Sequence, residues 1–301
     1  MFRGITYVLV LWLGIGCGEV YAQESFTVAT YNLAGYLDQL VQNRRLKSEE
    51  AKTAIQDTIL IARPDVLVVQ EMGKWSALKE LQSSLARRGV NYRHLRMVHG
   101  YDPYIHVGLL SRFPVVREHY HTNDVFLLEG KRMEVSRGFL EAEIRVTANY
   151  RFTLFAAHLK SKRSVIYGDE AMIRAREAEL LRAKIDAVFE RDAKANLLVL
   201  GDLNDTRDSR PIRTIIGRGA WSLKDTRPNE SSGVNGSPRR HTNWTYYFDR
   251  KDAYTRVDYI LLSRGMAAEW DAESSFVLAT PDWIDASDHR LVRVTFETTD
   301  R

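Results

Sequence analysis

Runs of apolar residues along the chain predict several strands, and two of these runs are uninterrupted. The segment Phe26–Tyr31 (FTVATY) alternates β-branched and aromatic residues, which is typical of a strand. The segments Val66–Gln70 (VLVVQ) and Leu197–Gly201 (LLVLG) are almost wholly apolar, as in strands that are buried on both faces. The pattern therefore predicts at least two central strands that are covered on both sides.

Apolar residues at helical spacing predict three helices. After Ser48, a residue suited to cap a helix, the sequence places Glu49 and Glu50 in the first turn. An apolar stripe runs along this helix, and Pro64 ends it; the stripe consists of Ala51, Ile55, Ile59 and Ala62. Residues 75–88 and Asp169–Arg191 also have the helical pattern.

The remaining apolar segments predict further strands and one long loop. The strands are expected at His106–Ser111, Phe139–Val146, Phe152–His158, Val257–Leu262 and Leu291–Glu297. Arg227–Arg240 is rich in Gly, Pro, Ser and Asn and is expected to be a polar loop. Because strands outnumber helices, we expect a mixed sheet system covered by helices, built as one domain.

The first 22 residues have the features of a cleaved signal peptide. Arg3 precedes a 12-residue apolar run, Ile5–Gly16, which is shorter than the roughly 20 residues of a membrane-spanning helix. Val20 and Ala22 place small residues at −3 and −1, so we expect cleavage before Gln23. Residues 23–301 then form a single catalytic domain without a transmembrane segment, secreted or periplasmic. Lipoprotein processing at Cys17 is the alternative, favoured less because Leu is missing at −3.

Composition excludes several classes of protein. The chain has 301 residues, of which 45% are hydrophobic and 27% charged, so it is neither disordered nor a small disulfide-stapled module. Its only cysteine, Cys17, lies in the predicted signal peptide, so the mature protein contains no disulfide. The net charge of +4 is compatible with a polyanionic substrate but does not require one.

Polar residues with metal-binding or acid–base chemistry lie at or directly after the predicted strands. They are Asn32, Glu71, His158, Asp202, Asn204, Asp258, Asp288 and His289. Taken singly, each is more often a turn residue or a satisfied core residue. As a set they offer carboxylate and amide oxygens, which are the ligands of Mg²⁺ or Mn²⁺, together with two histidines that can act as acid and base. Such a set suits in-line attack of water on phosphorus.

Seven motifs, in order, resemble the endonuclease/exonuclease/phosphatase superfamily, which has the deoxyribonuclease-I-like fold. They are ATYNLAGY, DVLVVQEM, VGLLSRFPV, FAAHLKSKR, VLGDLNDT, TRVDYILLS and ASDHRLVRV, and they span nearly the whole mature chain. The resemblance implies an α/β fold, a four-layer α/β sandwich of two packed mixed β-sheets flanked by helices. It also implies an active site at one end of the sandwich.

The same resemblance implies a role for each motif residue. Glu71 is implied as the main metal ligand, with Asn32 beside it and Asp288 acting through metal or water. Asp202 and Asn204 are implied to orient the attacking water and to hold a phosphoryl oxygen. His289, oriented by Asp258, is implied as base or phosphate contact, and His158 as donor to the phosphoryl or leaving oxygen. The division between acid and base stays open.

Three further residues are candidates for substrate binding. Lys160 and Arg163 follow His158 closely and could bind flanking phosphates, although a solvated loop explains them as well. Trp244, with Tyr246 and Tyr247 nearby, could stack on a base or line a leaving-group pocket, although core packing is the commoner use of such rings.

We therefore expect an exported, Mg²⁺- or Mn²⁺-dependent phosphoesterase, acting on a phosphodiester in the manner of a nuclease. Its partner is expected to be a phosphate-ester substrate, with nucleic acid as one candidate, and the protein itself is expected to be a monomer. The alternatives are a phosphomonoesterase, a small-molecule or lipid phosphodiesterase, and a catalytically silent binding module. Val257-Asp258-Tyr259 stands where inositol 5-phosphatases have Cys-Asp-Arg, which argues against that branch. The sequence shows no long apolar hairpin suited to entering a membrane, which weakens a lipid diesterase.

Overall fold

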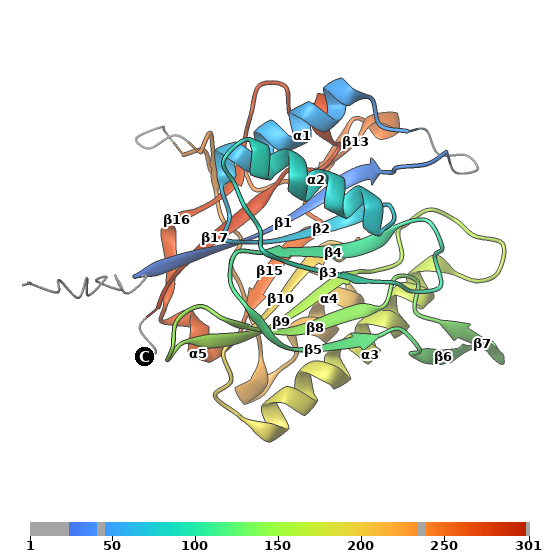
Figure 1. Ribbon diagram of the computed structural model, residues 1–301. Helices are drawn as coiled ribbons and strands as arrows, with labels where there is room; N and C mark the ends of the chain where they lie inside the picture. The colour runs from blue at the N-terminus through green and yellow to red at the C-terminus, as the bar shows by residue number, and fades with distance from the viewer. Residues whose placement is uncertain (1–23, 41–45, 234–238, 299–301) are drawn as a thin grey trace, which may run out of the picture.

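Two large mixed sheets pack face to face, and helices cover their outer faces. The computed structural model describes residues 24–40, 46–233 and 239–298, so the predicted signal peptide lies outside the described residues. Figure 1 shows α1 (Glu49–Ala62) and α2 (Trp75–Arg87) on one side of the sheets and α3 (Glu170–Arg191) on the other. This confirms the predicted four-layer α/β sandwich.

The first sheet has seven strands in the order β12-β16-β17-β1-β2-β4-β3. Its strands are β1 (Ser25–Tyr36), β2 (Val66–Met72), β3 (His94–Val98), β4 (His106–Ser111), β12 (Glu230–Ser231), β16 (Trp270–Leu278) and β17 (Val292–Glu297). At its centre β1 runs parallel to β2 and antiparallel to β17. The carboxyl ends of β1 and β2 therefore lie at the same edge, which brings Asn32 and Glu71 to that edge.

The second sheet has six strands in the order β11-β15-β10-β9-β8-β5. Its strands are β5 (Val115–His121), β8 (Phe139–Arg145), β9 (Arg151–His158), β10 (Leu197–Asp202), β11 (Lys224–Asp225) and β15 (Asp258–Leu262). Two small hairpins complete the described strands; they are β6 (Val125–Leu128) with β7 (Lys131–Glu134), and β13 (Tyr246–Phe248) with β14 (Ala253–Thr255).

The remaining helices are short. They are α4 (Arg210–Ile216), α5 (Arg264–Ala267), α6 (Trp283–Ala286) and the 3₁₀ turns η1 (Gly219–Trp221) and η2 (Asp249–Lys251). The predicted cap Ser48 is confirmed, because its Oγ accepts a hydrogen bond from Ala51 N. Asp169, which the sequence pattern placed inside the helix, is the N-cap of α3, and its Oδ1 accepts a hydrogen bond from Met172 N. None of the described helices combines the length and the apolar character that a membrane span needs.

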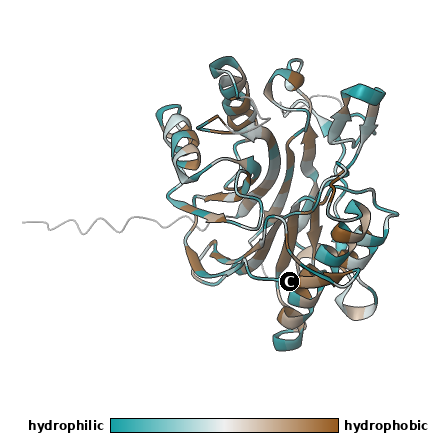
Figure 2. Ribbon diagram, turned by 90° about the vertical axis from the view of Figure 1, so that its right-hand side faces the viewer, coloured by the Kyte–Doolittle hydropathy of each residue, from teal (hydrophilic) through white to brown (hydrophobic). Residues whose placement is uncertain are grey.

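The uninterrupted apolar strands are buried on both faces, as predicted. In β2, Val66 and Val68 pack into the core between the sheets, and Leu67 and Val69 pack toward α1 and α2. The same alternation divides β10 between the inter-sheet core and the core under α3 and α4. Figure 2 shows these hydrophobic strands at the centre of the molecule, with more hydrophilic segments outside.

The apolar pattern of the sequence did not predict three strands of five residues or more: β3, β5 and β16. Both β3 and β5 are edge strands, and most of β5 is exposed, with the sequence VVREHYH. A strand at an edge needs few apolar residues, so its sequence does not separate it from a loop. The predicted loop Arg227–Arg240 also contains β12, a two-residue strand that pairs with β16.

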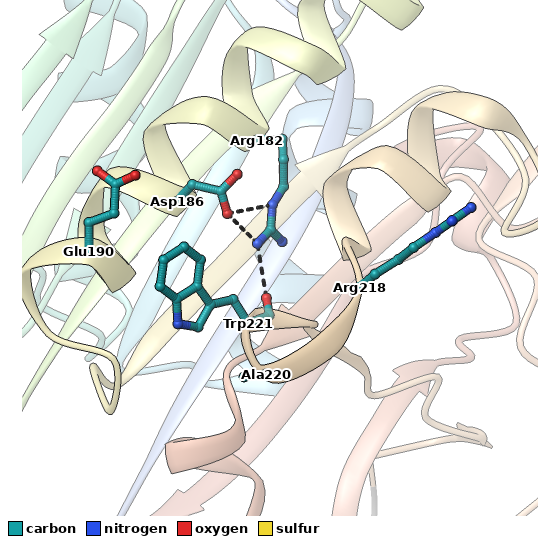
Figure 3. A pocket seen from close by; sticks show the side chains of 6 residues that line it. All are labelled: Arg182, Asp186, Glu190, Arg218, Ala220 and Trp221. Carbon is teal, nitrogen blue, oxygen red and sulfur yellow. Dashed lines mark hydrogen bonds and ion pairs between the residues drawn. The ribbon is translucent and has the colours of Figure 1, made fainter.

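A hollow of about 370 Å³ lies between α3 and η1, and the side chains around it connect these two elements (Figure 3). Arg182 lies against it and donates to Asp186 on its own helix and to the carbonyl oxygens of Ile215 and Trp221. These bonds occupy the guanidinium and fasten the end of α4 and the turn η1 to α3.

Candidate active site

Three neighbouring central strands of the second sheet place catalytic candidates in one row, at one end of the strands. Asp202, the last residue of β10, pairs with Asp258 on the antiparallel strand β15. On its other side it pairs with His158, the last residue of the parallel strand β9. Register alone therefore brings together three side chains from distant motifs.

Gly201 lets β10 approach β9 closely at this point. Its φ is +141°, and a Cβ at this position would lie 1.9 Å from the carbonyl oxygen of Ala157. Only glycine fits this conformation and this spacing. The glycine of the GDLND motif thus sets the distance between Asp202 and His158.

Asn32 reaches the row from the first sheet. Its side-chain amide donates to Asp202 Oδ2 at 2.9 Å. Its backbone carbonyl accepts a hydrogen bond from Ser287 Oγ at 2.7 Å, and that hydroxyl accepts one from His289 N at 3.0 Å. The serine of the ASDH segment therefore fastens the C-terminal motif to the end of β1.

Both predicted histidines face Asp202 Oδ2. His158 Nε2 lies 3.5 Å from this oxygen, and His289 Nε2 lies 3.9 Å from it. His289 Nδ1 is 2.8 Å from Asp258 Oδ2, a contact that holds the imidazole ring in a defined orientation. All four side chains are buried. The structure thus brings together His158, Asp202, Asp258 and His289.

Burial and charge shift the protonation of this cluster. Burial raises the pKa of Asp202 above its ordinary value, although the charge of His289 opposes the shift. Burial would lower the pKa of His289, but the carboxylate of Asp258, followed by Asp202 and Asp288, raises it instead. His289 is therefore positioned as a proton donor at neutral pH, and Asp202 as a carboxylate that can take up a proton.

Asn204 connects this cluster to the loop after β9. Its backbone N–H donates to Asp202 Oδ1 at 2.9 Å, and its side-chain amide donates to the carbonyl oxygen of Leu159 at 3.0 Å. Its φ of +55° is left-handed, a conformation that asparagine tolerates better than most residues.

Glu71 and Asp288 form the acidic part of the site. Glu71 also has a left-handed φ of +55°, which is uncommon outside glycine and occurs preferentially at functional sites. Burial raises the pKa of Asp288, and the charge of Glu71 raises it further. Carboxylate oxygens are the hard ligands that Mg²⁺ and Mn²⁺ take in proteins, so this donor set fits a divalent metal ion.

A second group of side chains also fits a metal ion. Asp202, Asp258 and His289 each offer a ligand atom, and these atoms lie within 4.8 Å of one another. Asp258 Oδ1 is buried and has no hydrogen-bond partner among the described residues.

The three predicted substrate-binding residues lie in different surroundings. The Lys160 ammonium donates to the carbonyl oxygens of Ser161 and Arg163, so it holds its own loop together. The Arg163 side chain is exposed. Trp244 is half-buried in a cluster of rings that includes Tyr254 and Trp283.

Sequence reasoning missed Lys47, which lies beside the acidic pair. Its ammonium donates to the carbonyl oxygen of Ala286 at 2.9 Å. Burial lowers the pKa of Lys47, while the charges of Asp288 and Glu71 oppose that shift. Nothing in the sequence distinguishes this lysine, which precedes a helix cap, from a solvated one.

Sequence reasoning also missed the positioning role of the segment Thr245–Tyr246. Thr245 Oγ1 accepts hydrogen bonds from the backbone N–H groups of Val257 and Asp258, each at 3.1 Å. The Tyr246 ring lies 4.6 Å from the His289 ring, centroid to centroid. The available signal was the row of aromatic residues just before the Asp258 strand.

Comparison with solved structures confirms the fold. The human Nocturnin catalytic domain, solved with bound sulfate, has a TM-score of 0.66 at 19% identity, covering 91% of this chain and 95% of that one. Sphingomyelinase C from Streptomyces griseocarneus has a TM-score of 0.59 at 18% identity, covering 90% and 99%. Truncated TDP2 from Caenorhabditis elegans has a TM-score of 0.59 at 17% identity, covering 91% and 98%.

The motif residues identified from the sequence lie within a longer match to a family model. A comparison with curated proteins found no match. The model of the Endonuclease/Exonuclease/phosphatase family matches residues 29–289, which include every candidate catalytic and metal-binding residue described above. The chain therefore belongs to the endonuclease/exonuclease/phosphatase family.

Proposed function

We propose that this protein is an exported, divalent-metal-dependent phosphodiesterase that acts in the manner of a nuclease. Members of its family hydrolyse phosphate esters. The observation that carries the proposal is the convergence of Asn32, His158 and His289 on one carboxylate, Asp202. A binding module would have no need of a buried acid–base cluster of this kind.

Glu71, Asp288 and Asn32 are the residues proposed to hold the metal. A bound Mg²⁺ or Mn²⁺ supplies positive charge that offsets the charge developing on the phosphoryl oxygens. The carboxylates of Glu71 and Asp288 are hard oxygen ligands, as both ions prefer. The side-chain nitrogen of Asn32 donates to Asp202 Oδ2. The side-chain oxygen of Asn32, which accepts a hydrogen bond from Ala34 N, is the atom that would bind the metal ion.

The remaining residues act on protons and on the phosphoryl group. Asp202, with its raised pKa, accepts a proton from the attacking water, while Asn32 and Asn204 fix the orientation of its carboxylate. His289, held by Asp258, and His158 donate to phosphoryl oxygens or to the leaving oxygen. The alternative in which His289 is the base requires it to lose a proton that Asp258 stabilises.

The test is turnover of a panel of phosphate esters with Mg²⁺ and Mn²⁺. It includes bis-(p-nitrophenyl) phosphate, plasmid, single-stranded DNA, RNA, nucleotides, inositol phosphates and sphingomyelin. We expect hydrolysis of diesters that a chelator abolishes and that Asp202→Asn lowers by about 10²–10⁴-fold. Asp208→Asn is the matched control, since Asp208 belongs to the exposed loop after the same motif. Turnover of monoesters or sphingomyelin alone favours the alternatives, and no turnover at all favours a binding module.

Export and oligomeric state belong to the same proposal. We propose that residues 1–22 are removed as a signal peptide and that the mature protein is a monomer, secreted or periplasmic. N-terminal sequencing of exported protein is expected to begin at Gln23. A lipid-modified Cys17 as first residue contradicts this and supports a lipoprotein.

A further inference from the structure

We propose that a cavity beside the catalytic cluster binds a nucleobase that flanks the scissile phosphate. This aromatic cavity has a volume of about 520 Å³ and is lined by Trp244, Tyr254 and Trp283, with Arg240 and Arg290 among its polar residues. The inference rests on the proposed phosphodiesterase function and names its substrate class as single-stranded nucleic acid.

The aromatic cavity is walled by rings that hold one another in place. The Trp244 ring lies 4.8 Å from that of Tyr254 and 5.0 Å from that of Trp283, both edge to face. Tyr247 stacks on Tyr254 at 4.7 Å from behind this wall. Tyr254 is 53% exposed, and Trp244 and Trp283 are partly exposed, so part of each ring remains accessible to a ligand. Partly exposed, mutually fixed rings are the platform on which bases stack.

A short backbone pairing joins the aromatic cavity to the catalytic cluster. Tyr246 forms a β-bridge with His289. On either side, Arg290 N donates to the carbonyl oxygen of Thr245 at 2.7 Å, and Tyr247 N donates to that of Asp288 at 2.9 Å. The segment that carries Trp244 is therefore joined directly to the segment that carries His289, which connects the aromatic cavity to the catalytic cluster.

The charges of the aromatic cavity favour an anionic ligand. The Arg290 guanidinium lies 4.2 Å from the centre of the Trp244 ring and 3.0 Å from Glu230 Oε2. Arg240, which is highly exposed, lies 3.8 Å from the other oxygen of Glu230. Arg290 is buried and already paired with Glu230, whereas the exposed guanidinium of Arg240 can offer its charge to a nucleic-acid backbone.

The same features of the aromatic cavity argue against a lipid as its ligand. A quaternary ammonium headgroup requires open aromatic faces without a competing cation, whereas Arg290 already lies over Trp244. An acyl chain requires aliphatic walls, but among the described residues only Ala279 and Pro281 line the cavity with aliphatic groups.

The test compares a single-stranded oligonucleotide with an abasic oligonucleotide of the same length, which keeps the phosphates but has no bases. The wild-type protein is expected to have a KM about tenfold lower for the oligonucleotide with bases, since stacking contributes about this factor or more per base. Tyr254→Ala and Trp283→Leu are expected to raise that KM toward the abasic value with a smaller effect on kcat. Trp75→Leu, at an exposed aromatic residue that does not line this cavity, is the matched control and is expected to leave both values unchanged.

Binding to catalytically inactive Asp202→Asn protein, measured by fluorescence anisotropy, separates the two proposals. If no phosphate ester is hydrolysed, the proposed function fails, while weaker oligonucleotide binding in Tyr254→Ala still supports the cavity. If diesters are hydrolysed but bases make no difference to KM or to binding, the inference is wrong and the function stands. Competition by phosphocholine, without competition by nucleotides, also overturns it in favour of a lipid headgroup.

Discussion

The side-chain amide of Asn32 donates a hydrogen bond to Asp202 Oδ2 at 2.9 Å, across 170 residues of sequence. Asn32 lies in the last part of β1 and Asp202 ends β10, in different sheets, so this bond joins the two halves of the sandwich at the candidate active site. Because both partners are buried, the bond also fixes which oxygen of Asp202 faces the two histidines.

The pair Asp258–His289 is predicted to work as one unit. His289→Ala should lower kcat by about 10²–10⁴-fold, since it removes general acid–base help. Asp258→Asn should cost the same or less, because Asp258 orients the ring through the 2.8 Å contact. The double variant should therefore be clearly less impaired than the product of the single losses, measured as kcat in a double-mutant cycle. Multiplicative losses contradict the pairing.

Glu71→Gln is predicted to weaken the metal and to lower activity. The substitution keeps the size of the side chain but removes a charged ligand from the acidic pair with Asp288. Titration of Mg²⁺ against activity should shift to higher concentration. The control is Glu190→Gln, an exposed residue on α3. An unchanged metal dependence in Glu71→Gln rejects the assignment.

Gly201→Ala is predicted to destabilise the fold and abolish activity. The new Cβ would lie 1.9 Å from a backbone oxygen in a left-handed conformation, so β9 and β10 must separate. We expect the free energy of unfolding to fall by about 3 kcal/mol or more, measured by urea denaturation. Gly130→Ala is the control, since its φ is +77° but no atom of the described residues lies within 4 Å of the added Cβ. If both variants lose the same free energy of unfolding, backbone strain alone explains the effect and the steric contact does not contribute.

Tyr246 is predicted to position His289 through its ring. Tyr246→Leu removes the ring contact at 4.6 Å and should lower kcat about tenfold, the value of a strong aromatic contact. Tyr246→Phe keeps the ring and should restore most of that loss. The kcat, KM and pH profile of both variants are compared with those of Tyr104→Leu, an exposed loop residue. Equal losses in Phe and Leu variants place the effect in the hydroxyl instead.

Asp205 is predicted to make stability sensitive to acid. Burial opposes ionisation, but Lys162 and Arg174 hold the pKa of Asp205 below its ordinary value. A lowered pKa in the folded state stabilises the fold above the ordinary pKa, and this contribution is lost as pH falls through the folded value. Asp205→Asn should cost about 3 kcal/mol at pH 7, since it leaves Arg174 buried without its carboxylate. Urea denaturation from pH 7 to pH 3 should show this difference shrinking; a constant difference contradicts the linkage.

The sequence by itself determined the central strands, the capped helices and the motif residues of the site. Val66–Gln70 and Leu197–Gly201 could be recognised because double burial removes polar residues from nearly every position. Ser48 could be recognised because a helix leaves its first N–H groups unpaired and a nearby side chain must accept them. Edge strands such as β5 could not, since one open side allows polar residues throughout.

Only the tertiary structure decided how these residues meet. The row of Asp258, Asp202 and His158 depends on strand register, and the contact with Asn32 depends on how two sheets pack. The Lys160 ammonium binds backbone carbonyls of its own loop, and Lys47 lies beside Glu71. Neither contact can be predicted from the local sequence pattern. Local sequence encodes burial and chain direction through periodicity and caps, whereas convergence on one carboxylate is a property of long-range packing, which only the folded chain fixes.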